Sequence, residues 1–146
     1  MWQEIEKEKR IAEHLFYVSL KYTKTCDVIL NLIARWQNMI EKSINAILEK
    51  SKKKRLIKNI PTAPRAKVNL LLDIFKREKI IKETLDLYIL FKNIPRLQHT
   101  REGEFRKNVN LKVIECEKSI NINLEKLKQW QETLERFLSF VKHFIK

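Results

Sequence analysis

Apolar side chains in the first third of the chain recur at steps of three and four residues, and this stripe constrains the fold more than any other feature. Its mean step, 32 residues over nine intervals, is close to the 3.6 residues of an α-helical turn. Neither Gly nor Pro interrupts the stripe, so the pattern predicts a helix over about residues 3–54. The stripe consists of Leu15, Val18, Tyr22, Cys26, Ile29, Ile33, Trp36, Ile40, Ile44 and Ile47.

A single helix of that length conflicts with the size of the chain. Fifty residues at about 1.5 Å each extend roughly 75 Å, whereas a compact domain of 146 residues has a diameter of only about 38 Å. Either the helix bends at Thr23 and Thr25, the weakest helix formers near its middle, or the molecule is elongated or dimeric. We expect a homodimer, because the stripe is longer than one small bundle can cover.

The last third repeats the helical spacing and predicts one helix over about residues 108–145. Glu117 and Gln131 are the polar exceptions in its stripe. The apolar members are Val113, Ile120, Leu124, Leu127, Leu134, Leu138, Val141 and Ile145.

The middle of the chain predicts two shorter helices, over about residues 64–76 and 79–94. A basic connector over residues 55–63 precedes them, and a polar junction over residues 95–107 follows. Because no strand pattern is found, the sequence predicts a single all-α domain over residues 1–146. The expected architecture is an antiparallel bundle of four to five helices with long first and last helices.

Gly103 is the only glycine, and this excludes several enzyme classes. The Rossmann fingerprint, the P-loop and the nucleophile elbow each need two or more glycines in close order. Cys26 and Cys116 lack the close spacing of a zinc site, and neither His14 nor His143 has a helical Glu or His partner at metal-binding spacing, so we expect no metal and no cofactor. With no signal peptide and no run of ~20 apolar residues, the chain is expected to be cytoplasmic, without a membrane span.

The net charge of +13 is concentrated in the middle of the chain. Residues 51–112 hold 17 Lys and Arg against 6 Asp and Glu. A localised excess of this kind favours binding of a polyanion, and RNA or a nucleotide is the leading hypothesis. An acidic protein partner and a merely solvated basic surface are the alternatives. The expected phosphate contacts are Lys52, Lys53, Lys54, Arg55, Arg96, Arg101, Arg106 and Lys107.

The polar junction also collects the residues of a possible catalytic site. His99 lies between Arg96 and Arg101, and metal-independent RNA cleavage needs a general base and a cation for the developing phosphorane charge. His99 with Arg96 or Arg101 would supply both. The alternative is a charged connector whose Arg and Glu side chains pair with one another at a helix start, and the sequence favours this reading over catalysis.

The order of these features resembles the HEPN-like helical bundles. The resemblance covers the helical layout of most of the chain and the stretch Phe91–Val109, which looks like the junction before the final helix of those proteins. Their RNase members share an Arg, four to six residues, and then a His; here Arg101 is followed after six residues by Asn108. The resemblance implies a dimeric bundle associated with RNA or with a nucleotidyltransferase partner, and the altered motif implies a protein that does not cleave RNA.

Overall fold

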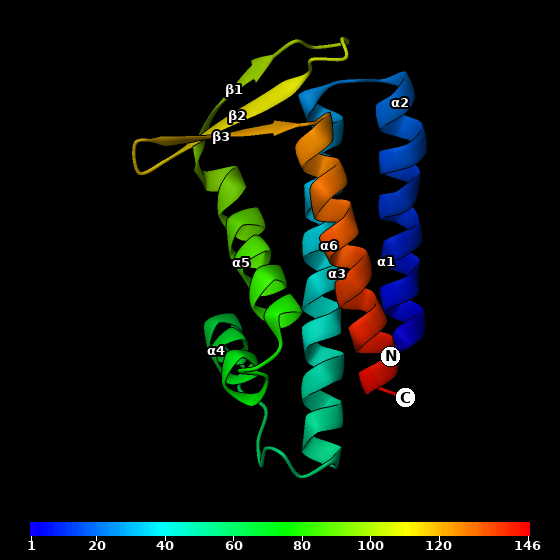
Figure 1. Cartoon of the computed structure of the whole chain (residues 1–146), viewed down its shortest axis with the longest axis vertical. Helices are drawn as coiled ribbons and strands as arrows, with labels where there is room; N and C mark the ends of the chain where they lie inside the picture. Colours follow the sequence, from blue (N-terminus) through cyan, green and yellow to red (C-terminus); the bar gives the residue numbers. More distant parts are fainter.

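A computed structural model describes residues 1–146 and shows that the first stripe folds into a helical hairpin (Figure 1). One arm contains α1 (Trp2–His14), the π-helical segment η1 (Leu15–Ser19) and the short turn α2 (Leu20–Tyr22); the other arm is α3 (Cys26–Lys53). Thr23 leaves helical geometry with φ −133° and ψ 89°. Thr25 caps α3, because its Oγ1 accepts the amide N–H of Val28 at 3.3 Å. The helix is therefore broken at Thr23–Thr25, where the sequence is weakest in helix formers.

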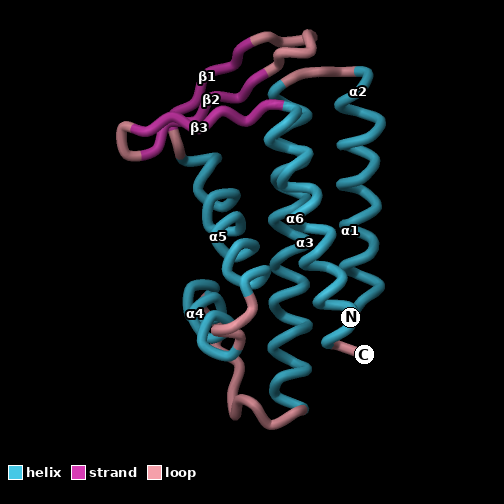
Figure 2. Tube along the Cα trace, viewed as in Figure 1, coloured by secondary structure: helices cyan, strands magenta, loops and turns pink.

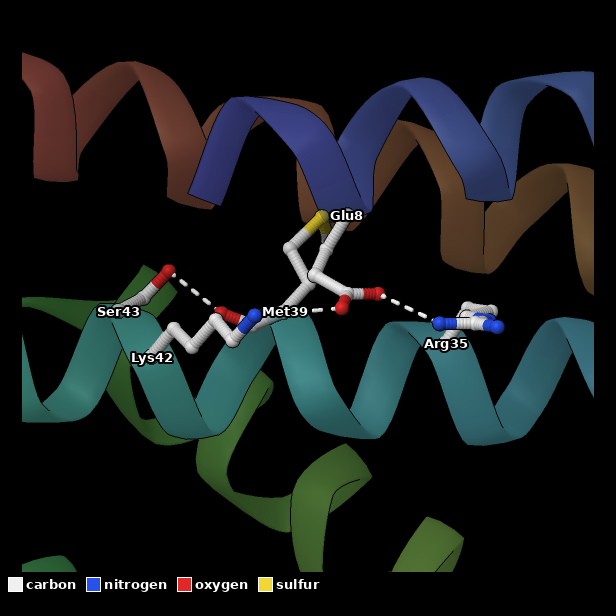
Figure 3. A network of polar contacts seen from close by, with 5 residues as sticks. All are labelled: Glu8, Arg35, Met39, Lys42 and Ser43. Atoms are coloured by element: carbon white, nitrogen blue, oxygen red, sulfur yellow. Dashed lines mark hydrogen bonds and ion pairs between the residues drawn. The ribbon is translucent and has the colours of Figure 1, made fainter. Parts of the chain in front are cut away.

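The stripe residues of α3 are buried in one core that α1, α5 and α6 share. Ile5 of α1 and Ile29 and Ile40 of α3 are fully buried. Glu8 is the only buried carboxylate, and Figure 3 shows it on α1 between two cations of α3, Lys42 Nζ at 3.2 Å and Arg35 at 3.5 Å. A buried charge is costly unless it is paired, so this network favours one register of α1 on α3.

The homodimer prediction rests on a stripe too long for one chain to cover. The chain turns back at Thr23–Thr25, and its own helices cover most of the stripe. This reason for expecting a dimer therefore no longer applies. The homodimer stays a prediction, and the core of a single chain does not depend on it.

Two helices follow in the middle of the chain, α4 (Pro64–Ile74) and α5 (Lys79–Asn93), and a 3-10 turn, η2 (Ile94–Arg96), ends this part. Pro64 occupies the first turn of α4, where its missing N–H is not needed. The helix α5 is packed through Phe91, whose ring lies 5.9 Å from that of Trp36 on α3 and 5.2 Å from that of Trp130 on the last helix. None of the helices in the chain combines the length and the apolar character needed to cross a membrane.

The all-α prediction is wrong, because residues 98–123 form an antiparallel sheet and the fold is α+β. Its strands are β1 (Gln98–Glu102), β2 (Asn110–Glu115) and β3 (Lys118–Asn123), in the order β1-β2-β3. The last helix, α6 (Leu124–Phe144), therefore begins at residue 124 and not at 108. The sheet lies across one end of the helices, as Figure 1 shows.

Alternation along the strands explains the sheet. Leu111, Val113 and Ile122 are fully buried, and the residues between them are more exposed. This period of two places one face of the sheet on the helices and the other in solvent. Glu117, a polar exception in the predicted helical stripe, lies in the turn between β2 and β3 with φ 68°, and a left-handed residue does not continue a helix.

Candidate nucleic-acid interface

The two basic segments predicted to contact phosphates lie at opposite ends of α3. Lys52 and Lys53 are in its last turn, whereas Arg101 pairs with Asp27 in its first turn at 2.8 Å. The helix has 28 residues and is therefore about 42 Å long. The eight predicted residues consequently do not form one continuous surface.

The sheet end carries the more structured of the two segments. The turn between β1 and β2 lies against the loop between α2 and α3, as Figure 2 shows for the two neighbouring pink segments. The amide of Phe105 donates to Lys24 O at 2.6 Å, and the amide of Cys26 donates to Glu104 at 3.2 Å. We call residues 21–25 and 103–108 together the tip.

Backbone geometry in the tip is specific. Gly103 has φ +62°, and a Cβ there would lie 2.6 Å from Asn108 O, so no other residue fits without rearrangement. Phe105 also has a left-handed backbone, with φ 66°, which is uncommon for an aromatic residue. Its bond to Lys24 holds this conformation and leaves the ring outside the core.

Two aromatic side chains of the tip are highly exposed, Tyr22 at 79% and Phe105 at 74%. Three cations accompany them: Lys21, whose Nζ lies 6.0 Å from the Tyr22 ring centroid, and Arg106 and Lys107, which are exposed and make no ion pair. Flat aromatic faces beside free cations form the combination that binds single-stranded nucleic acid.

The sequence pattern assigns Tyr22 and Val18 to the buried stripe, and this assignment is wrong. Both are exposed, whereas Leu20 is buried. The cause is η1. A π-helical turn contains one more residue than an α-helical turn, so Val18 within it and Tyr22 after it are rotated away from the core. A stripe of regular spacing gives no signal of that insertion, so the sequence does not reveal Tyr22 as a surface aromatic.

Arg101 contributes less to this site than its position in the sequence predicts. Its guanidinium forms an ion pair with Asp27 at 2.8 Å and lies 3.9 Å from Glu104. We therefore assign Arg101 to holding the tip on α3. Within the tip, Arg106 and Lys107 are the members of the predicted set that make no ion pair.

The three residues of the possible catalytic site are only partly brought together. His99 and Arg101 lie two residues apart on one face of β1 and line a cavity of about 320 Å³ with apolar residues of α3 and α5. His99 Nδ1 lies 3.2 Å from Leu97 O. Arg96 precedes the strand and lines a different cavity, between α4 and α5. The chain places no group of three potential metal-ligating side chains together.

The opposite end of the molecule presents Lys52, Lys53, Lys54 and Arg55 to solvent. Lys54 Nζ lies 4.5 Å from the ring centroid of Phe144, a half-buried ring that also packs on Phe75 and Phe140. No exposed aromatic accompanies the cluster. It offers charge alone, without a stacking surface.

Comparisons with family models, with curated proteins and with solved structures give no match for this chain. The resemblance to HEPN-like bundles stays a prediction.

Proposed function

We propose that this protein binds single-stranded RNA through the tip and does not cleave it. Bases stack on Tyr22 and Phe105, and phosphates contact Lys21, Arg106 and Lys107. The observation that supports this proposal is the exposure of the two aromatic rings, 79% and 74%, beside cations without ion pairs. A cytoplasmic location is part of the proposal, and the free, exposed thiol of Cys116 is compatible with a reducing compartment.

Binding without cleavage is proposed because Arg101 already pairs with carboxylates. A ribonuclease needs a cation free to stabilise the charge that develops on the phosphorane. Arg101 is the only cation that shares a cavity with His99, and Asp27 and Glu104 already compensate its charge. Arg96, the other cation predicted to assist His99, lines a separate cavity.

The proposal predicts salt-dependent RNA binding that maps to one end of the molecule. With three phosphate contacts, the affinity for a fluorescein-labelled ten-nucleotide oligo(U) should fall roughly twentyfold between 50 and 200 mM salt. Fluorescence anisotropy measures this. Combined Arg106→Ala and Lys107→Ala substitutions should remove most of the binding and reduce the salt slope.

The matched control removes two cations at the opposite end, Lys52→Ala with Lys53→Ala. Because both pairs are exposed and carry the same charge, a purely electrostatic attraction would respond equally to both double variants. Equal losses would therefore contradict the proposal, as would no binding at 50 mM salt. An acidic protein that co-purifies with the chain, with no nucleic acid in the preparation, would favour the acidic-partner alternative.

A gel assay with the same RNA tests metal-independent cleavage as the second candidate function. The observation in its favour is that His99 and Arg101 share one cavity. RNA incubated with the protein in EDTA should stay intact on a denaturing gel. Cleavage that His99→Ala abolishes, with binding unchanged, would replace the binding-only proposal by a ribonuclease centred on His99.

A further inference from the structure

A second cavity, of about 350 Å³, lies between α4 and α5, away from the tip. It falls within the size range of small-molecule sites. Its lining combines three cations, Arg65, Lys92 and Arg96, with no carboxylate. None of the three cations makes an ion pair or a side-chain hydrogen bond elsewhere, so their charge is uncompensated within the chain.

The cations gather at one end of this cavity because of how the two helices are connected. A short link, residues 75–78, joins the end of α4 to the beginning of α5. The start of α4, with Arg65, consequently lies beside the end of α5, with Lys92, and beside Arg96 in η2. Cations far apart in the sequence thus converge on one region of the cavity.

The remainder of the lining is apolar, apart from two amides and Tyr88, whose hydroxyl donates to Glu41 at 2.9 Å. Val68 is buried and Leu72 half-buried on α4, whereas Ile89 on α5 is 47% exposed although it is a large apolar residue. Asn69 and Asn93 add hydrogen-bonding groups without charge. An exposed apolar patch beside unpaired cations fits a ligand that has a flat apolar part and an anionic part.

We propose that the cavity between α4 and α5 binds a nucleoside 5′-phosphate. The base lies on Leu72 and Ile89, the amides of Asn69 and Asn93 contact its polar edge, and the phosphate lies among Arg65, Lys92 and Arg96. Guanidinium groups suit phosphate because they donate two parallel N–H bonds. A free nucleotide and the 5′-terminal nucleotide of an RNA share this chemistry, and this site is independent of RNA binding by the tip.

Isothermal titration calorimetry at 50 mM salt tests the proposal with four probes: ADP, adenosine, inorganic phosphate and a 5′-phosphorylated trinucleotide. Either ADP or the trinucleotide should bind at least tenfold more tightly than adenosine and inorganic phosphate. Tight binding of ADP identifies a free nucleotide as the ligand. Binding of the trinucleotide alone, weakened by Lys92→Ala and not by Phe105→Gly, identifies an RNA end. Binding of neither phosphorylated probe, or equal binding of adenosine, would overturn the proposal.

Two lysines of α5, the half-buried Lys92 and the exposed Lys82, provide a pair of variants. Lys92→Ala removes a cation that lines the cavity, and Lys82→Ala removes one on the same helix that does not. Lys92→Ala should weaken binding about tenfold or more, and Lys82→Ala should leave it unchanged. Equal effects would assign the binding to general charge and reject the site. Because Phe105 is outside this cavity, Phe105→Gly should not affect ADP, so failure of the tip and failure of this site are distinguishable.

Discussion

Phe105 adopts a left-handed backbone conformation although its ring is largely exposed and fills no part of the core. For an L-residue this conformation costs about 1–2 kcal/mol, and glycine avoids the cost. An aromatic residue at this position therefore lowers the free energy of unfolding, and its exposed ring adds no core packing that would offset the loss. Strain of this kind concentrates at functional sites, which agrees with the stacking role proposed for Phe105.

Replacing Phe105 by Gly should therefore separate stability from RNA binding. The relief of strain exceeds the added entropy of the unfolded chain, so the free energy of unfolding should rise by about 0.5–1 kcal/mol in urea titrations followed by circular dichroism. The affinity for oligo(U) should fall roughly 5- to 160-fold, on the order of 1–3 kcal/mol for one stacked base. Leu56→Ala, which truncates an exposed apolar residue at the opposite end, should leave the affinity unchanged. Full RNA affinity in Phe105→Gly would contradict the stacking role.

The two cysteines should differ sharply in reactivity. Burial, reinforced by the neighbouring Glu104 carboxylate, raises the pKa of the Cys26 thiol from 9.0 to about 11. At pH 8 Cys26 is therefore protonated and unreactive, whereas Cys116 is exposed in the turn between β2 and β3. Iodoacetamide should modify only Cys116 in the native protein, as peptide mass spectrometry can show, and both thiols in urea. Rapid native alkylation of Cys26 would contradict this.

The same pKa shift sets the sign of a stability change at alkaline pH. Since the thiol of Cys26 releases its proton at lower pH in the unfolded chain, its contribution to stability is complete below pH 9 and is lost as the pH rises from 9 to 11. Tyr88 acts in the same direction, because burial and its hydrogen bond to Glu41 at 2.9 Å raise the pKa of its hydroxyl.

At the scale of elements, regular helical spacing predicts the helices well in the parts of the chain that form no strand. The break at Thr23–Thr25 coincides with the weak point of the first stripe, and α4 and α5 lie within two residues of the predicted ranges 64–76 and 79–94. These segments could be read from the sequence because each buries one continuous face against its neighbours.

The sheet could not be predicted in the same way, because the spacing of Val113 and Ile120 fits a helix as well as a pair of strands. They are seven residues apart, which is two helical turns, yet they are also directly paired across β2 and β3. Cys116 and Glu117, which have left-handed backbones, form the turn that reverses the chain. The segment is therefore a hairpin and not a helix. Neither of these two residues is Gly or Asn, the usual signals of such a turn, so the hairpin is hidden in the sequence.

Only part of the candidate site could be predicted from the sequence. Arg106 and Lys107 stand out in the sequence as part of a basic junction. Tyr22 does not, because the π-helical segment η1 rotates it away from the core without any change in the apolar spacing. Surface residues whose exposure depends on such an insertion become visible only in three dimensions.

For the whole molecule, the net charge of +13 divides among regions that act separately. The cluster Lys52–Arg55 and the tip are separated by the length of α3, about 42 Å, which is several times the Debye length of about 8 Å at physiological salt. Charges at the two ends therefore do not attract the same phosphate. The high charge of the middle third is therefore divided among separate basic clusters and forms no single basic face.

The cavity between α4 and α5 and the tip should also act independently. Arg96 lies two residues before the start of β1, and the five residues of that strand extend about 17 Å toward the tip. Effects of substitutions more than about 10 Å apart are normally additive. Arg96→Ala should therefore weaken ADP binding and leave oligo(U) affinity within twofold, and Phe105→Gly should do the reverse.

The double variant Arg96→Ala with Phe105→Gly should show both losses, each equal to that of the corresponding single variant, in parallel calorimetry and anisotropy titrations. A loss of oligo(U) affinity in Arg96→Ala as large as that in Phe105→Gly would contradict independence. It would mean that one RNA strand occupies both sites, with its 5′ end in the cavity between α4 and α5. Removing the 5′ phosphate from the oligonucleotide distinguishes this outcome, because only a strand that reaches Arg96 loses affinity with it.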